Sequence, residues 1–70
     1  MTTIAIARAA LEVPASVQNN NCVQDGQWRL RDALKLAAPC KDEDPAPSYV
    51  LKAVRDLQSW VQFCLDRPVV

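Results

Sequence analysis

The residues of this sequence that could perform chemistry are three cysteines and a short acidic run. The cysteines, Cys22, Cys40 and Cys64, are widely spaced, odd in number and include no C-x-x-C pair. They therefore match neither the ligand spacing of a zinc site nor the even disulfide framework of a small secreted protein. The sequence also has no histidine, which is both the commonest zinc ligand and the commonest general base.

The acidic run Asp42, Glu43, Asp44 is followed at once by Pro45, so it lacks the spacing of a calcium-binding EF-hand loop. The single glycine, Gly26, excludes a glycine-rich phosphate-binding loop. A cysteine nucleophile would need an activating base or a lowered pKa, and no residue pattern here provides one. We therefore expect a protein that is not an enzyme and that uses no metal or cofactor.

Length and charge limit the remaining classes of function. The 70 residues are enough for one small domain, and eight Lys and Arg side chains balance eight Asp and Glu side chains. A neutral chain is poorly suited to nucleic acid, because affinity for phosphate comes from basic side chains that release counterions. No apolar run approaches the roughly 18 residues of a membrane-spanning helix, and free thiols are typical of a reducing compartment. The sequence therefore predicts a single cytoplasmic domain over residues 1–70.

The N-terminal segment is predicted to form a short helix. Thr2 or Thr3 can cap it, and it runs to about Glu12, because alanine and arginine favour a helix and Pro14 ends it. The alternative is a short strand, since the side chains of residues 3–7 alternate weakly in size. The asparagine-rich stretch that follows is predicted to form a loop.

Two longer helices are predicted to follow. Asp25 caps one over about residues 26–38, and Asp44 caps another from about Pro45 to Asp66. A polar connector of about six residues predicts that the two helices lie antiparallel, with the N-terminal segment packed across them. The predicted fold class is all-α, a small three-helix domain with a C-terminal helical hairpin. The alternative is a small α+β domain with an N-terminal strand.

The third predicted helix, which Arg67 and Pro68 close, has an apolar surface that is too wide for one neighbouring helix. At about 100° per residue, two apolar seams separate on it. The first seam, suited to one antiparallel neighbour, consists of Val50, Val54, Leu57, Val61 and Cys64. The second, which we call the aromatic seam, consists of Tyr49, Ala53, Trp60 and Phe63, with Asp56 in the same row. Either the N-terminal helix covers the aromatic seam or the seam is a contact surface.

Charged residues near the aromatic side chains are predicted to orient a partner. An isolated carboxylate in a buried seam would be costly, so Asp56 either lies at a wet edge or meets a cation from a neighbour. On the second helix, Trp28 lies opposite the predicted buried stripe, with Asp32 one turn on, Arg31 and Lys35 beside it, and Arg29 adjacent in sequence. A tryptophan among cations can anchor a protein contact, stack on a nucleic-acid base, or cover a loop.

The leading functional hypothesis is a small protein-binding regulator or inhibitor that acts stoichiometrically on a larger complex. Its predicted anchors are Tyr49, Trp60, Phe63 and Trp28, with Asp56, Arg29 and Arg31 giving orientation. In size and composition the chain is similar to the accessory proteins that phages encode against host machinery, such as inhibitors of RNA polymerase, although no motif carries this similarity. The alternatives are a nucleic-acid-associated factor that uses the Trp28 face, and a structural homodimer that buries the aromatic seam.

Overall fold

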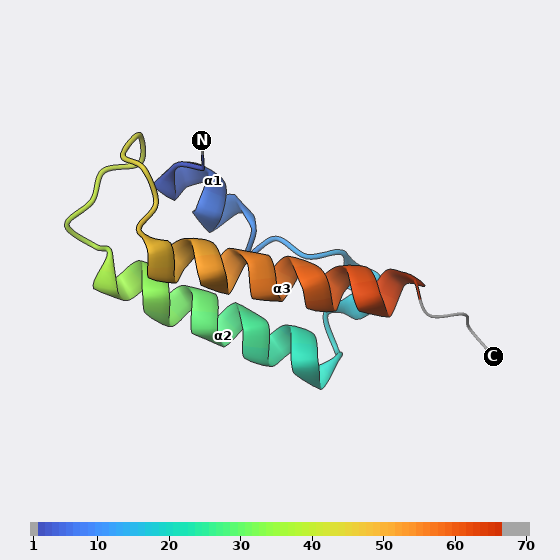
Figure 1. Cartoon of the computed structure of the whole chain (residues 1–70). Helices are drawn as coiled ribbons and strands as arrows, with labels where there is room; N and C mark the ends of the chain where they lie inside the picture. Colours follow the sequence, from blue (N-terminus) through green and yellow to red (C-terminus); the bar gives the residue numbers. More distant parts are fainter. Residues whose placement is uncertain (1, 67–70) are drawn as a thin grey trace.

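The computed structural model describes residues 2–66, which form three α-helices and one short 3₁₀ helix. The α-helices are α1 (Ile4–Ala9), α2 (Asn21–Leu36) and α3 (Ser48–Asp66), and the 3₁₀ helix spans Ala15–Val17. α2 and α3 lie antiparallel as a hairpin, and α1 lies across one side of it (Figure 1). The predicted all-α domain with a C-terminal hairpin is confirmed. The predicted end of the third helix at Arg67 and Pro68 lies outside the described residues.

The N-terminal segment forms a helix, as predicted, but a shorter one. The Thr3 hydroxyl caps it by accepting a hydrogen bond from the Ile6 amide at 3.3 Å. α1 ends at Ala9, and turn-type hydrogen bonds continue as far as the Glu12 amide. The strand alternative is not supported, because in residues 2–66 the β-type pairing is a single bridge between Thr3 and Pro45.

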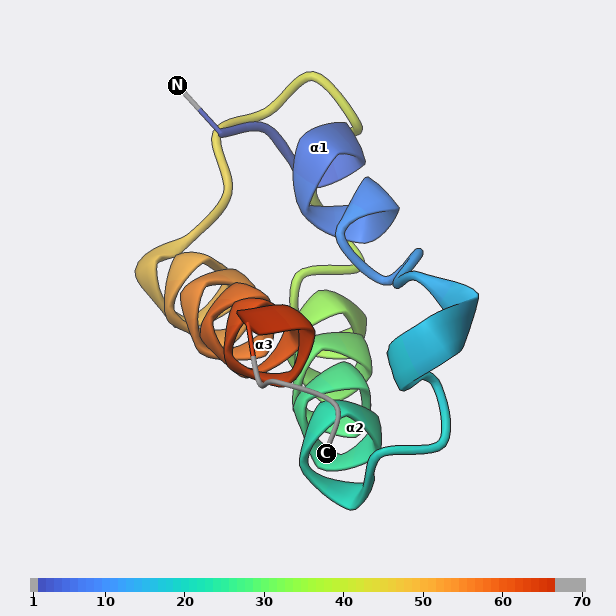
Figure 2. The same cartoon turned by 90° about the vertical axis from the view of Figure 1, so that its right-hand side faces the viewer.

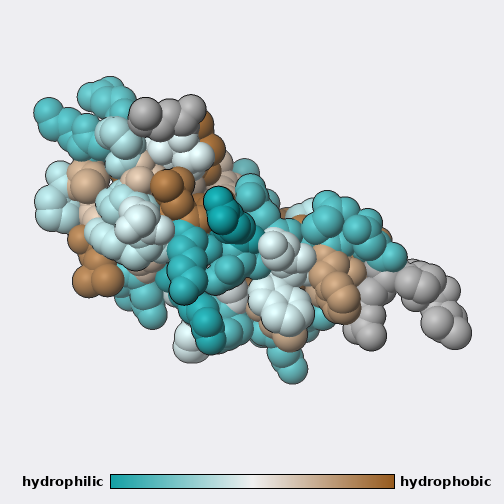
Figure 3. All heavy atoms as spheres, viewed as in Figure 1, coloured by the Kyte–Doolittle hydropathy of each residue, from teal (hydrophilic) through white to brown (hydrophobic). Residues whose placement is uncertain are grey.

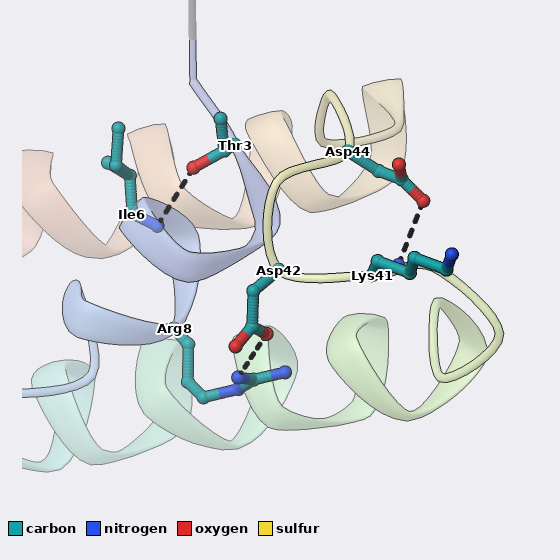
Figure 4. Close-up of polar contacts among 6 residues, drawn as sticks. All are labelled: Thr3, Ile6, Arg8, Lys41, Asp42 and Asp44. Carbon is teal, nitrogen blue, oxygen red and sulfur yellow. Dashed lines mark hydrogen bonds and ion pairs between the residues drawn. The ribbon is translucent and has the colours of Figure 1, made fainter.

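The connector between α2 and α3, residues 37–47, holds α1 in place. The Asp42 carbonyl accepts a hydrogen bond from the Ala5 amide at 3.0 Å, which satisfies one of the amides that a helix N-terminus leaves without a partner. The Arg8 side chain donates to the Asp42 carboxylate at 2.6 Å (Figure 4). Asp42 therefore fastens the connector to α1 through both its backbone and its side chain.

Asp44 also holds the connector against α1. The prediction that Asp44 caps the third helix is wrong. Its carboxylate accepts a hydrogen bond from the Lys41 amide at 2.8 Å and so closes a turn inside the connector (Figure 4). Its carbonyl accepts a hydrogen bond from the Ile4 amide at 3.0 Å. The acidic run thus serves the start of α1, and the connector is longer than the six or so residues predicted.

α3 begins at Ser48 rather than at Pro45. The residue before a proline avoids the helical conformation, so Pro47 disfavours a helical Ala46 and delays the helix. The Ala46 amide instead donates a hydrogen bond to the Thr2 carbonyl at 3.0 Å. The two prolines therefore extend the connector along the N-terminal segment before α3 starts.

α2 begins earlier than predicted, because Asn20 rather than Asp25 is its N-cap. The Asn20 side-chain oxygen accepts hydrogen bonds from the amides of Cys22 at 2.9 Å and Val23 at 3.2 Å. Asp25 lies within the helix, where its carboxylate pairs with Arg29 at 3.1 Å. Both residues are good caps by type, and the earlier one starts the helix.

Gly26 is a point of close approach between α2 and α3. A Cβ atom at position 26 would lie 3.1 Å from Leu57 Cδ1 and 3.4 Å from Leu57 Cα. Because Leu57 is completely buried, a larger residue here would push the two helices apart. The glycine belongs to a stripe of α2 that faces α3 and the core, with alternating steps of three and four: Val23, Gly26, Leu30, Ala33 and Ala37.

The core is aliphatic and built from small side chains. Within residues 2–66 eleven hydrophobic residues are buried, and four of them are alanines. The first seam of α3 enters this core as predicted, with Val50 and Leu57 fully buried and Val54 nearly so. The side chains that could have made the core larger are the aromatic ones, and they lie elsewhere.

Replacing Gly26 by valine should lower the free energy of unfolding by about 1–3 kcal/mol, because the added methyl groups would overlap Leu57. The control is Asp32→Val on the exposed side of the same helix, which should change stability by less than about 0.5 kcal/mol. Urea denaturation followed by circular dichroism measures both values. A Gly26→Val variant as stable as the control would contradict the close packing of α2 on α3.

Candidate functional site

All four aromatic side chains of the chain lie outside the core. Their exposed fractions are 43% for Trp60, 44% for Tyr49, 53% for Phe63 and 69% for Trp28. Aromatic side chains usually contribute strongly to a core, because each can bury about 150–250 Å². Because these side chains lie at the surface, much of their apolar area stays in contact with water.

The N-terminal segment does not cover the aromatic seam. Seen along the hairpin, α1 and the segment after it lie on one side of α2 and α3, and no other described helix lies on the opposite side (Figure 2). The segment after α1 runs beside the polar side of α3, where Val13 and Pro14 line a shallow hollow of about 570 Å³ with Gln58 and Gln62. At 100° per residue, Trp60 lies on the other side of the buried seam from Gln58.

Trp60 and Phe63 form one end of the aromatic seam. Their ring centroids are 6.0 Å apart and their planes meet at 85°, an edge-to-face arrangement that is favourable for aromatic pairs. Tyr49 lies near the start of the same helix, roughly 16 Å away along the axis at 1.5 Å per residue. The aromatic seam therefore extends along most of α3.

Asp56 interrupts the aromatic seam and is exposed, as in one of the two predicted alternatives. The ion pairs among residues 2–66 are Arg8 with Asp42 and Arg29 with Asp25, so Asp56 takes part in none of them. The surface is consequently mixed rather than uniformly apolar. Figure 3 shows such a mixture on the face where α3 is in front, with hydrophobic groups separated by hydrophilic side chains.

α2 extends the aromatic seam into a wider surface. Gln27 of α2 donates a hydrogen bond to the Leu11 carbonyl at 2.9 Å, so this side of α2 faces the N-terminal segment. The opposite side of α2 carries Arg29 and Leu36, about half a turn away from Gln27. We call the combined surface the open flank; it consists of Arg29, Leu36, Tyr49, Asp56, Trp60 and Phe63.

Leu36 is a member of the open flank that sequence reasoning missed. Its side chain is 74% exposed, the largest exposed fraction among the large hydrophobic residues of the described chain. The helical period predicts its position, because Leu36 and Arg29 are seven residues apart and therefore lie on one side of α2. The predicted buried stripe through Leu30 and Leu34 lies on the other side of α2.

The structure divides the second group of predicted site residues. Trp28 is 69% exposed and lines two shallow hollows, one of about 760 Å³ beside Gln18 and Asn19 of the asparagine-rich loop and one of about 460 Å³ with Arg31, Asp32 and Lys35. Arg29 lies on the open flank instead, where it pairs with a carboxylate of its own helix. Trp28 thus keeps two cations and one carboxylate beside it.

Residues 2–66 hold no group of three or more His, Cys, Asp or Glu side chains placed to bind a metal ion. In the same part of the chain, every helix is too short or too polar to span a lipid bilayer. The cysteines are free thiols, exposed at Cys22 and partly buried at Cys40 and Cys64. The open flank and Trp28 together carry five of the eight exposed large hydrophobic side chains of residues 2–66.

Comparison with known proteins gives no match: none of the protein-family models, curated proteins or solved structures searched is similar to this chain. The function must accordingly be inferred from the surface chemistry described above.

Trp60→Gln and Phe63→Gln should each leave a folded helical protein, with a loss of about 1–2 kcal/mol from the lost ring contact and partial burial. Leu57→Ala is the contrasting core variant and should cost about 2–5 kcal/mol. Circular dichroism and urea denaturation measure all three. If either glutamine variant loses its helical signal, the rings belong to the core and not to a contact surface.

Proposed function

We propose that this protein is a non-catalytic protein-binding regulator that occupies a surface of a larger complex through its open flank. The observation that supports this most strongly is the distribution of aromatic residues. Three of the four lie along one flank of α3, while the core is aliphatic. Tryptophan and tyrosine are among the residues that most often anchor protein interfaces, because they bury a large area in one place.

Small side chains beside the open flank favour a helical segment of the partner. Two small residues, Ala33 at the edge of the buried stripe of α2 and the partly buried Ala53 of α3, lie next to the larger side chains of the flank. Small side chains let another helix approach the hairpin closely. An amphipathic helix laid along α3 would place its apolar side chains against Tyr49 and Trp60, as in the helix-in-groove mode of recognition.

The charged residues of the open flank would set the orientation of that partner. Asp56 lies between Tyr49 and Trp60 along α3 and pairs with no cation in residues 2–66. A partner cation placed opposite Asp56 would fix the register, whereas a carboxylate there would be repelled. Arg29, at the other margin of the flank, offers the opposite charge.

A protein of this size without catalytic groups acts by mass action, so its effect should scale with its amount relative to the target. Inhibition of a larger complex, such as a host RNA polymerase by a phage-encoded protein, is one form of this role. The Trp28 face supports nucleic-acid binding less well, because Asp32 offsets one of its two cations and phosphate affinity grows with the number of cations in contact.

Affinity capture from a lysate of the source organism tests the proposal. The wild-type chain and Trp28→Glu should retain the same partner, whereas Trp60→Glu combined with Phe63→Glu should lose it at least about tenfold. Trp28→Glu is a matched control, since it also replaces an exposed tryptophan on a helix by a carboxylate. A partner lost from Trp28→Glu but kept by the flank variant would contradict the assignment, as would the absence of any specific partner.

A further inference from the structure

We infer that, before a partner binds, the open flank is covered by the open flank of a second copy of this chain. Self-association and partner binding then compete for one surface, so the protein masks its own binding site. The competition rests on the proposed function, whereas the self-association is argued from the flank itself.

The open flank exposes enough apolar surface to favour self-association. Tyr49, Trp60 and Phe63 each leave about half of the side chain exposed, and Leu36 leaves more. Since a fully covered aromatic side chain buries about 150–250 Å², these four residues offer on the order of 400 Å² per copy. Two copies together offer on the order of 800 Å², which approaches the roughly 1,200 Å² of the smallest specific interfaces once the polar margin is added.

The charges of the open flank are also compatible with a second copy. A twofold interface brings a surface against its own copy, so the surface must be complementary to itself. The open flank carries one cation, Arg29, and one carboxylate, Asp56, at different positions, and its margins add Lys52 and also Asp25, which pairs with Arg29 at 3.1 Å. A flank with both signs can pair cations with carboxylates twice across a twofold axis, whereas a flank of one sign would repel its copy. The net charge of zero also leaves little long-range repulsion between copies.

The helical hairpin also leaves room for a second copy. Two antiparallel helices with a remaining uncovered flank are half of a four-helix bundle. α1 lies on the side of the hairpin away from the open flank, so it does not obstruct a second hairpin (Figure 2). Two copies joined by their flanks would form a four-helix core, with each α1 on the outside.

Sedimentation equilibrium of the full chain over a dilution series tests the self-association. The wild-type chain should pass from monomer to dimer as concentration rises. Trp60→Glu should raise the dimer dissociation constant at least about tenfold, and Trp28→Glu should leave it unchanged. A wild-type chain that stays monomeric throughout, or a dimer weakened equally by both variants, would overturn the inference.

Two single-tryptophan variants locate the interface in the same samples. In Trp28→Phe, the emission of Trp60 should shift to shorter wavelength as the dimer forms, because the ring leaves water. In Trp60→Phe, the emission of Trp28 should stay constant over the same range of concentration. A shift of Trp28 alone would place the interface on the other face and overturn the inference.

The outcomes separate the two proposals. If the chain is monomeric but captures a partner through Trp60, the proposed function stands and the self-masking inference falls. If Trp60→Glu dissociates a wild-type dimer and no partner is captured, the covering copy is supported and the proposed function is contradicted. When both hold, adding the captured partner should dissociate the dimer, and a partner that binds the intact dimer would overturn the competition.

Discussion

The packing of Leu57 against Gly26 is the constraint on which the arrangement of this protein depends. It sets the rotation of α3 about its own axis, because Leu57 must point at the backbone of α2. At 100° per residue, Val50 and Val54 then enter the core and Trp60 falls on the flank. The surface that we assign to binding is therefore a direct consequence of how the hairpin closes.

The connector between α2 and α3 decides which flank stays open. α1 has only six residues, of which Ile4 and Ala7 are buried in the core, and its first amides bond to the connector. Hydrogen bonds from Ala5 to Asp42 and from Ala46 to Thr2 hold the N-terminal segment on one side of the hairpin. The aromatic side chains lie on the other side, so the N-terminal segment leaves the flank uncovered.

Helical periodicity and the choice of capping residues were enough to predict the fold class, the hairpin and the buried seam through Leu57. The helix starts were less predictable. For α2, Asn20 and Asp25 are both good caps. For α3, Pro45 is compatible with a first helical turn, but Pro47 disfavours a helical residue before it and delays the start. Whether the N-terminal segment covers the aromatic seam depends on backbone hydrogen bonds to the connector. Those bonds leave no pattern in the side-chain sequence, so this point required the structure.

The central claim is that the aromatic seam of α3 faces away from the N-terminal segment. Nuclear Overhauser effects in solution test it most directly, on a sample dilute enough to be monomeric. The structure predicts an effect between the Leu57 methyl groups and the Gly26 α-protons, and none between the Trp60 ring and the methyl groups of Ile4 or Val13. Effects between the Trp60 ring and either of those methyl groups would contradict the account, because the N-terminal segment would then cover the flank.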